Sequence, residues 1–95
     1  MSKLRESARG EHCTTEVAGV CNYNPETVVL CHIRMPGTGI ARKPHDIHGV
    51  YGCSSCHDAL DRRVTEPEME HHRWFYIARA LMRTHERMIE KGVFT

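Results

Sequence analysis

The chain has 95 residues, and its 13 Lys and Arg against 12 Asp and Glu give a formal net charge of +1. A chain of this length forms about one small domain with a modest core, so a bound metal or a partner chain would help to stabilise the fold. Its 40% of apolar residues excludes a disordered tail. The near-neutral charge excludes a strongly basic histone-like protein, although a local basic patch would be enough to bind nucleic acid.

The N-terminal residues 1–13 are charged and polar, and no apolar run approaches the roughly 20 residues of a membrane span. We therefore expect no signal peptide, no membrane contact and a cytoplasmic location. Because thiols stay reduced in the cytoplasm, the five cysteines indicate a metal site or a reactive group rather than disulfides.

The first part of the chain predicts a short helix, a turn-rich loop and a strand. Residues 2–9 suit a short helix that ends at Gly10. Residues 11–26 contain two cysteines, two asparagines and Pro25, as turn-rich zinc knuckles do. Residues 27–33 are β-branched and apolar and are predicted to form a strand.

The middle of the chain predicts a loop, a second strand and the start of a helix. Residues 34–44 hold two glycines and two prolines and read as a loop, and residues 46–53 suit a short strand that pairs with the first. The serines at 54–55 are expected N-caps of a helix. On this helix His57 and Asp61 lie four residues apart and share one face, which suits two ligands of one cation.

The C-terminal part predicts one long helix over residues 65–92, started by a capping box at Thr65 and stopped at Gly92. Its expected buried face repeats at helical spacing: Trp74, Ile77, Ala78, Leu81, His85 and Met88. A second apolar set, Phe75, Met82 and Ile89, widens this face. We expect the face mainly to cover the core, and the alternative is that part of it forms the surface of a homodimer.

Four of the five cysteines form a predicted metal site. Cys53 and Cys56 are a C-x-x-C pair, and Cys13 and Cys21 make a second pair at longer spacing than in a zinc ribbon. Four thiolates would hold a structural Zn²⁺ that ties the N-terminal loop to the start of the helix. The alternative, a redox pair, normally lies beside a βαβ pattern, which these elements lack. Cys31 remains and is expected to be a small buried apolar side chain.

The histidines and the second cysteine pair follow a further pattern. His32 lies on the first predicted strand, and "CSSCHDALD" (53–61) leads from the second strand into the helix. This order resembles the ββα-metal, or HNH-type, nuclease fold, whose helix usually reads C-x-x-C-H-x-x-x-H; here Asp61 stands in the final ligand position. The segments "ARGEHC", "GVCNYNPETVVLCHIR" and "CSSCHDALDRR" make the chain similar to the YbcO group of prophage-encoded nucleases, from Leu4 to Arg63.

The resemblance implies an α+β fold in a single domain, residues 1–95. A zinc-braced, HNH-like ββα-metal core would occupy 1–64 and the long C-terminal helix 65–92. It also implies a metal-dependent endonuclease, encoded by a phage or prophage, that hydrolyses DNA phosphodiester bonds. A recombination protein that delivers the DNA is a candidate partner on the same grounds.

In such a nuclease His32 would be the general base, since the unperturbed pKa of histidine lies near neutrality, and Asp46 would orient it or bind the metal. His57 and Asp61 would hold Mg²⁺ or another divalent ion, which stabilises charge on phosphorus and on the leaving oxygen. The basic residues expected to hold DNA phosphates are Arg34, Arg42, Lys43, Arg62 and Arg63.

Alternatives stay open for some of these residues and for the function. His48 could take the middle position of the HNH pattern in place of Asp46. His57 could complete the zinc site in place of Cys13 or Cys21. The second function is a zinc-stabilised module that binds nucleic acid or a protein without catalysis. The sequence also leaves open whether the substrate is duplex, single-stranded or branched DNA, or RNA.

Overall fold

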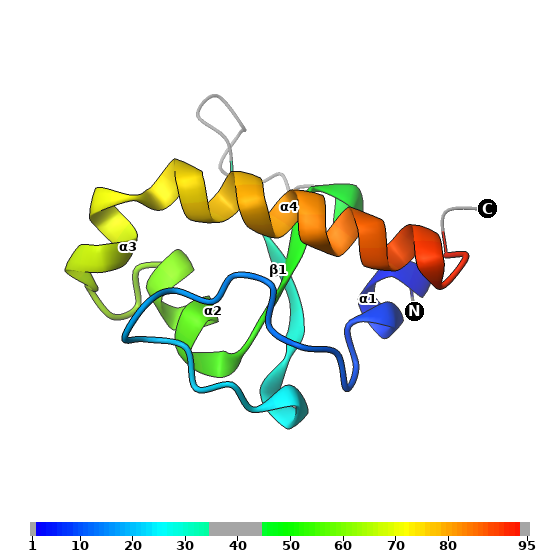
Figure 1. The fold of residues 1–95 in the computed structure, drawn as a ribbon, viewed down its shortest axis with the longest axis horizontal. Coiled ribbons are helices and arrows are strands. Elements are labelled where there is room, and N and C mark those ends of the chain that lie inside the picture. The colour runs from blue at the N-terminus through cyan, green and yellow to red at the C-terminus, as the bar shows by residue number, and fades with distance from the viewer. Residues whose placement is uncertain (1, 35–44, 94–95) are drawn as a thin grey trace.

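The computed structural model describes residues 2–34 and 45–93. These residues form a small α+β fold with a two-stranded sheet and four α-helices (Figure 1). In chain order the elements, with two 3₁₀ helices written η, are α1 Lys3–Ser7, η1 Pro25–Thr27, β1 Val29–His32, η2 Asp46–His48, β2 Gly49–Gly52, α2 Ser54–Leu60, α3 Pro67–His71 and α4 Arg73–Glu90. Within these ranges no helix is long and apolar enough to cross a bilayer.

The two strands form an antiparallel pair within the ranges predicted for them. The register runs from Val29 opposite Gly52 to His32 opposite Gly49. Every residue of β2 is buried, so β2 lies at the centre of the core. A Cβ atom at Gly52 would lie 2.8 Å from the Cys31 sulfur, and this close approach explains why the strand ends in glycine.

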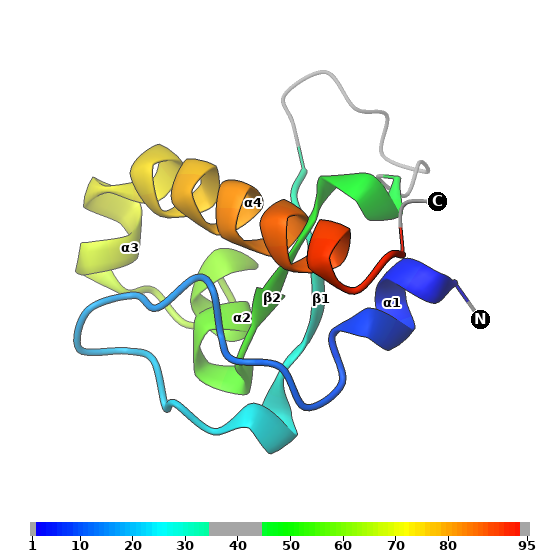
Figure 2. The same cartoon turned by 45° about the vertical axis from the view of Figure 1, so that its right-hand side comes forward.

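Helix α4 crosses the hairpin and satisfies the free edge of β2 (Figures 1 and 2). The Thr84 hydroxyl accepts a hydrogen bond from the Tyr51 N–H at 3.1 Å and lies 2.8 Å from the Thr14 hydroxyl. The Thr14 hydroxyl in turn donates to the Tyr51 carbonyl at 2.9 Å. These three residues close a buried ring of hydrogen bonds, so both backbone groups of Tyr51 have partners.

The long C-terminal helix expected over 65–92 is in fact two helices. The helix is interrupted at His72, whose φ of −120° and ψ of 29° are not helical. No glycine or proline stands at this point in the sequence. The break turns α3 back toward α2 (Figure 1), and Met69 of α3 is fully buried. The expected capping box at Thr65 is also absent: Glu66 is the N-cap of α3 and has no side-chain cap bond.

The buried face of α4 differs in part from the predicted one. Ile77 and Met88 are buried as expected, whereas Trp74 and Ala78 are exposed. The face is completed by residues that the apolar pattern left out: Tyr76, Ala80 and Thr84. Thr84 was missed because a threonine can be buried when its hydroxyl has partners, and periodicity in apolar residues does not register it.

The helix ends were predicted in part. The structure confirms that α1 stops before Gly10 and that α4 stops before Gly92, each glycine having a positive φ. At α2 the N-cap is Cys53 rather than one of the serines at 54–55, and its sulfur accepts the Cys56 N–H at 3.4 Å. In a C-x-x-C turn the first sulfur thus takes the place of the usual capping oxygen.

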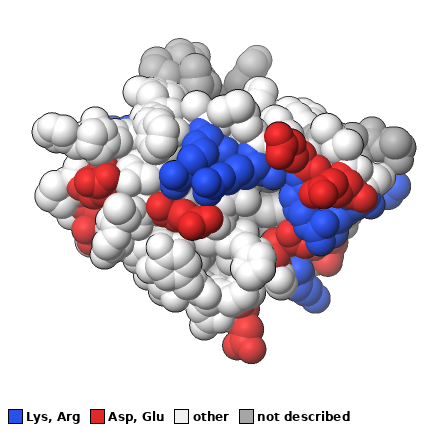
Figure 3. All heavy atoms as spheres, viewed as in Figure 1, with Lys and Arg blue, Asp and Glu red and all other residues white. Residues whose placement is uncertain are grey.

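The N-terminal loop is tied to α4 by ion pairs. Arg83 pairs with Glu16 at 3.1 Å, Arg87 with Glu11 at 2.7 Å, and Lys91 with Glu11 at 3.2 Å. Figure 3 shows the result on this face of the molecule, where basic and acidic side chains lie side by side. The positive charges on this face are therefore largely neutralised within the chain.

Candidate functional site

The four predicted cysteines meet at one point. The sulfurs of Cys13, Cys21, Cys53 and Cys56 all lie within 4.8 Å of one another. In a tetrahedron with Zn–S distances of about 2.3 Å, neighbouring sulfurs are about 3.8 Å apart. The sulfurs of Cys21 and Cys53 are 3.8 Å apart. The donor set and its spacing therefore fit a metal ion such as zinc.

Hydrogen bonds and burial shift the pKa values of the thiols in this cluster. The cysteine sulfurs accept N–H groups of Glu16, Val17 and Asn22 at 3.4 to 3.5 Å. A hydrogen bond with Cys56 lowers the pKa of the Cys13 thiol to about 5, and the same bond raises the pKa of Cys56. Burial raises the pKa of Cys21 to about 12. Four thiolates this close need a cation to offset their charge, which a bound metal would supply.

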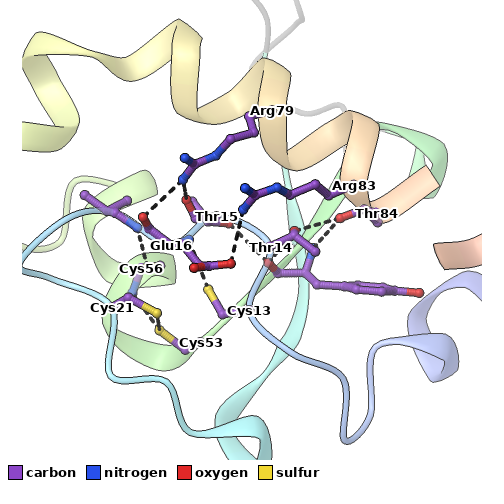
Figure 4. Close-up of polar contacts among 12 residues, drawn as sticks. Cys13, Thr14, Thr15, Glu16, Cys21, Cys53, Cys56, Arg79, Arg83 and Thr84 are labelled. Atoms are coloured by element: carbon purple, nitrogen blue, oxygen red, sulfur yellow. Dashed lines mark hydrogen bonds and ion pairs between the residues drawn. The ribbon is translucent and has the colours of Figure 1, made fainter. Parts of the chain in front are cut away.

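The loop that carries Cys13 is held in place by two arginines of α4. Figure 4 shows Arg79 and Arg83 reaching from the helix to this loop. The Arg79 guanidinium donates to the carbonyls of Thr15 and Glu16 at 3.1 and 3.2 Å, and it lies over the Tyr76 ring at 5.3 Å. The cysteine cluster therefore joins the N-terminal loop to the start of α2, and the two arginines join the same loop to α4.

Cys31 lies outside this cluster, as expected. It is fully buried between the strands, and burial raises the pKa of its thiol.

On the far end of the hairpin, His32 and Asp46 form a close pair. The His32 Nε2 atom is 2.7 Å from Oδ1 of Asp46, which follows the loop and opens η2. Hydrogen bonds from Ser2 and His32, together with the charge of Arg5, lower the pKa of Asp46 to about 2. Asp46 is thus ionised at neutral pH and can only accept a hydrogen bond. The proton of this bond is therefore on His32 Nε2, and the lone pair of the neutral ring is on Nδ1.

His85 of α4 holds η2 next to this pair. Its Nε2 atom lies 2.8 Å from the carbonyl of Ile47, which immediately follows Asp46. A carbonyl only accepts, so this ring nitrogen donates. The contact fixes the short helix from which Asp46 projects. The sequence analysis included His85 in the expected buried face of the long helix and gave no sign of this role.

His57 and Asp61 share a face of α2, as their spacing predicts. His57 Nε2 lies 3.1 Å from Asp61 Oδ2, and Arg63 Nη2 lies 3.6 Å from the same oxygen. Among the described residues, the cysteine cluster alone brings three or more potential ligands together. A cation held by His57 and Asp61 would thus have these two side chains as its protein ligands among the described residues. His57 also lies apart from the cysteine cluster, so it does not replace Cys13 or Cys21.

A cavity of about 620 Å³ is lined by one member of each of these two pairs, His32 and Asp61, whereas Asp46 and His57 are not among its lining residues. The described residues that line it are His32, Ile33, Arg34, Leu60, Asp61, Arg62, Arg63, Arg73, Trp74 and Ile77. His32 comes from the end of β1 and Asp61 from the end of α2. The lining contains four arginines and one carboxylate, so the cavity has a positive character that suits phosphate.

The predicted basic residues are only partly placed. Arg34, Arg62 and Arg63 line the cavity, and their binding of DNA phosphates stays a prediction. Arg42 and Lys43 lie outside the described residues. His48 is exposed, whereas Asp46 contacts His32. Arg73 and Trp74 also line the cavity, and the sequence analysis missed both. The sequence analysis placed this Arg-Trp pair within one continuous helix that covers the core, so it gave neither residue a role at a binding site.

The end of α2 has an unusual backbone. Arg63 donates its N–H to the Asp58 carbonyl at 2.9 Å and Arg62 to the Ala59 carbonyl at 3.3 Å, the two bonds of a Schellman motif. Arg62 occupies the position that favours glycine, with a φ of 57°. The end of α4 has the same motif, but there Gly92 takes this position with a φ of 72°. An arginine therefore stands at the cavity where glycine would be easier to accommodate.

These features define a small α+β protein with a four-cysteine cluster that could hold a metal ion such as zinc, and with a separate basic cavity. The model of the "Putative nuclease YbcO" family matches residues 2–93, and the chain belongs to this family.

Individual relatives agree with the assignment to this family. "Putative nuclease YbcO" of Escherichia coli (strain K12) and the protein of the same name from Enterobacteria phage 82 are each 52% identical over 65 residues, 67% of this chain and 68% of those proteins. A solved structure, "Structure of a putative bacteriophage protein from Escherichia coli str. K-12 substr. MG1655", matches with a TM-score of 0.72 at 36% identity. The match covers 94% of this chain and 99% of that one. The family is thus one of phage-associated proteins that bear the name of nuclease.

Proposed function

We propose that this protein is a metal-dependent endonuclease of the HNH type that hydrolyses DNA phosphodiester bonds. The observation that carries the proposal is that one cavity is lined by both His32, whose ring is bonded to Asp46, and Asp61. The order β1, β2, α2 is the order that a ββα-metal fold requires. Family membership adds that relatives are named as nucleases.

His32 is the proposed general base. Its Nδ1 atom carries the lone pair because Nε2 is bonded to the Asp46 carboxylate. This nitrogen takes a proton from a water molecule that attacks phosphorus. Asp46 acts as a positioning residue: it fixes the tautomer and the orientation of the ring, and it stabilises the imidazolium once the proton has moved. Asp46 is therefore our candidate for the middle position of the HNH pattern.

His57 and Asp61 are the proposed ligands of the catalytic divalent ion. Their donor atoms are 3.1 Å apart. The carboxylate suits Mg²⁺ and Mn²⁺, and the imidazole suits Ni²⁺. The ion would act as a Lewis acid on the phosphate and on the leaving oxygen. With only two ligands from the described residues, most of its coordination sphere would be left to water and substrate.

The arginines of the cavity are the proposed phosphate contacts. Arg34 has no ion-pair partner among the described residues, so its charge is available to a phosphate. Arg62 and Arg63 are exposed and pair with partly exposed carboxylates, Arg62 with Glu70 at 2.9 Å and Arg63 with Asp58 at 3.4 Å. Exposed pairs of this kind are worth about 0–1 kcal/mol and can be exchanged for phosphate oxygens. Such contacts give affinity without sequence readout.

The cysteine cluster has a structural role in this proposal. A Zn²⁺ ion bound to Cys13, Cys21, Cys53 and Cys56 would brace the first turn of α2, one residue before His57. The ion would be closed to substrate, because four protein sulfurs complete its tetrahedron. Two metals would therefore serve two purposes, one for folding and one for cleavage.

The test is nicking of supercoiled plasmid with Mg²⁺, Mn²⁺ or Ni²⁺ by the zinc-loaded protein. We expect His32→Ala to reduce the rate at least about 100-fold, because general-base catalysis contributes about that much. His12→Ala is the matched control, since His12 is exposed and lies outside the cavity. Equal rates for wild type and His32→Ala would refute the base assignment. If no metal supports cleavage by the wild type, the chain is better described as a zinc-stabilised binding module.

We also propose that the protein forms a homodimer through α4. Three large apolar side chains on this helix, Phe75, Met82 and Ile89, are 60 to 66% exposed and follow one another at seven-residue intervals. At that spacing they form a stripe along one side of the helix, which a second copy could cover.

A further inference from the structure

Trp74 is exposed at the wall of the basic cavity. Its side chain is 52% exposed on the first turn of α4, although tryptophan is among the residues that gain most from burial. Within the described part of the chain, the indole makes no ring contact, cation–π contact or hydrogen bond. By contrast, the exposed ring of Phe75 next to it has the Arg79 guanidinium 5.2 Å from its centre. Trp74 thus offers an open aromatic face to whatever enters the cavity.

Beside Trp74 lie positively charged side chains that suit the phosphate of a nucleotide. Arg73, its neighbour, is largely buried and is held by the Leu60 carbonyl and by Glu70, so its guanidinium is fixed at the cavity wall. Arg62 meets the same Glu70 from the end of α2. The wall therefore carries an aromatic plane beside cations that are held in position. Phosphates pair with the cations, and a nucleobase has a flat face that stacks on the aromatic plane.

The size of the cavity agrees with such an occupant. Its volume of about 620 Å³ falls within the range of roughly 300–1,000 Å³ that small organic ligands occupy. A base inside a duplex cannot use this wall, because both of its faces are covered by neighbouring base pairs. A base in a single strand, a flap or a junction has an open face.

We propose that Trp74 stacks on an unpaired nucleobase, so that the preferred substrate contains a single-stranded segment of DNA. This inference deepens the proposed nuclease function and rests on it for the position of the scissile phosphate near His32. The base is selected by its aromatic face, so the stacking distinguishes unpaired from paired DNA and reads no sequence. Arg73 positions the wall and supplies positive charge beside it.

The test is binding without added Mg²⁺, so that cleavage does not interfere. Trp74 is the single tryptophan of the chain, and its fluorescence therefore reports on this position alone. The zinc-loaded protein is titrated with a 12-nucleotide oligothymidylate, with a hairpin duplex, and with an abasic oligonucleotide that has the same number of phosphates. We expect quenching by the first, which has both unpaired bases and phosphates, and much weaker quenching by the other two.

Variants separate stacking from charge. The Trp74 variants contain no tryptophan, so their affinities are measured by the fluorescence anisotropy of labelled DNA. Trp74→Ala should weaken binding of the single strand at least about tenfold and change duplex binding by less than about twofold, while Trp74→Phe should retain part of the difference. Tyr23→Ala is the matched control, because Tyr23 is 68% exposed and lies outside the cavity. Wild-type affinity of Trp74→Ala for the single strand, or equal quenching by the abasic strand, would overturn the inference.

These readouts are independent of catalysis. If quenching follows the expected pattern and no plasmid is nicked, Trp74 stacks on bases and the nuclease proposal fails. If nicking depends on His32 but Trp74→Ala binds single strands like wild type, the nuclease proposal stands and this inference fails.

Discussion

The ring of His32 at the end of β1 is hydrogen-bonded to the carboxylate of Asp46, with 2.7 Å between Nε2 and Oδ1. The two residues are 14 positions apart in the chain, and the hairpin brings them together because His32 pairs with Gly49 in the register. The partners of Asp46 keep it ionised, so this bond determines which nitrogen of His32 is free. The relationship can be tested directly.

Asp46→Asn should lower the nicking rate about 10- to 100-fold while the protein stays folded, because an amide can donate to the ring and favour the other tautomer. In the His32→Ala background the same substitution should have little further effect, since Asp46 is proposed to act through His32. Nicking rates of the four proteins and the ¹⁵N shifts of the His32 ring provide the measurement. Additive losses in the double variant would assign Asp46 a role independent of His32.

The pKa of Asp46 also predicts a dependence on pH. Because the folded-state pKa is lowered to about 2 from 3.8, the stabilisation by this carboxylate is complete above about pH 4 and is lost as the pH falls toward 2. The difference in free energy of unfolding between wild type and Asp46→Asn should therefore shrink as the pH falls from about 4 to 2. A difference that stays constant over this range would mean that the folded protein does not lower the pKa of the Asp46 carboxyl.

The purified protein should contain close to one tightly bound zinc ion per chain, and Cys53→Ser should unfold or aggregate. Cys31→Ser is the comparison variant and should keep its zinc, because Cys31 lies outside the cluster. Zinc affinity should fall as the pH falls, since the raised pKa values of Cys21 and Cys56 mean that both thiols must release protons to bind the metal. Elemental analysis and calorimetry in two buffers measure both effects. Full stability after removal of the metal would refute the structural role.

Arg62→Gly should leave the free energy of unfolding within about 1 kcal/mol of wild type, because the relief of the positive φ offsets the backbone entropy of glycine. The same substitution should reduce the slope of log affinity for DNA against log salt by about 0.7 to 0.9, the loss of one phosphate contact. Arg83→Ala removes an arginine outside the cavity and should leave the slope unchanged. A wild-type slope for Arg62→Gly would exclude Arg62 from the phosphate contacts.

Thr84→Val should lower the free energy of unfolding by about 1–3 kcal/mol, because the Tyr51 N–H would be left buried without an acceptor. Thr84→Ser keeps the hydroxyl and should lose less. Urea denaturation of the zinc-loaded proteins provides the measurement. If valine is tolerated as well as serine, the hydrogen-bonded ring around Tyr51 contributes little to stability.

Met82→Glu should convert the proposed dimer into a monomer, because a charge in the middle of the exposed stripe would have to be desolvated in the interface. Sedimentation velocity across a range of concentrations gives the oligomeric state. A wild type that remains monomeric at high concentration would show that the stripe does not hold two copies together.

The sequence by itself determined the features that depend on neighbouring residues or on the chemistry of one residue type. The strand ranges follow from β-branched residues, the stops of α1 and α4 from glycines, and the His57–Asp61 pair from helical spacing. The set of four cysteines follows from thiol chemistry. The α+β class and the family were also predicted correctly, whereas the HNH-like ββα-metal type stays a prediction. The roles of His32, Asp46, His57 and Asp61 stay predictions, as do the cytoplasmic location and a recombination protein as partner.

Tertiary structure alone decided the remaining features, because they depend on contacts between residues far apart in the chain. The break at His72 has no glycine or proline to announce it, and it accompanies the packing of Met69 into the core. Thr84 is buried because Tyr51 and Thr14 supply partners for its hydroxyl. Trp74 and Arg73 join His32 at one cavity only because α4 crosses the hairpin near the end of α2. Apolar periodicity predicts which face of a helix is apolar. It does not predict which element of the fold packs against each face.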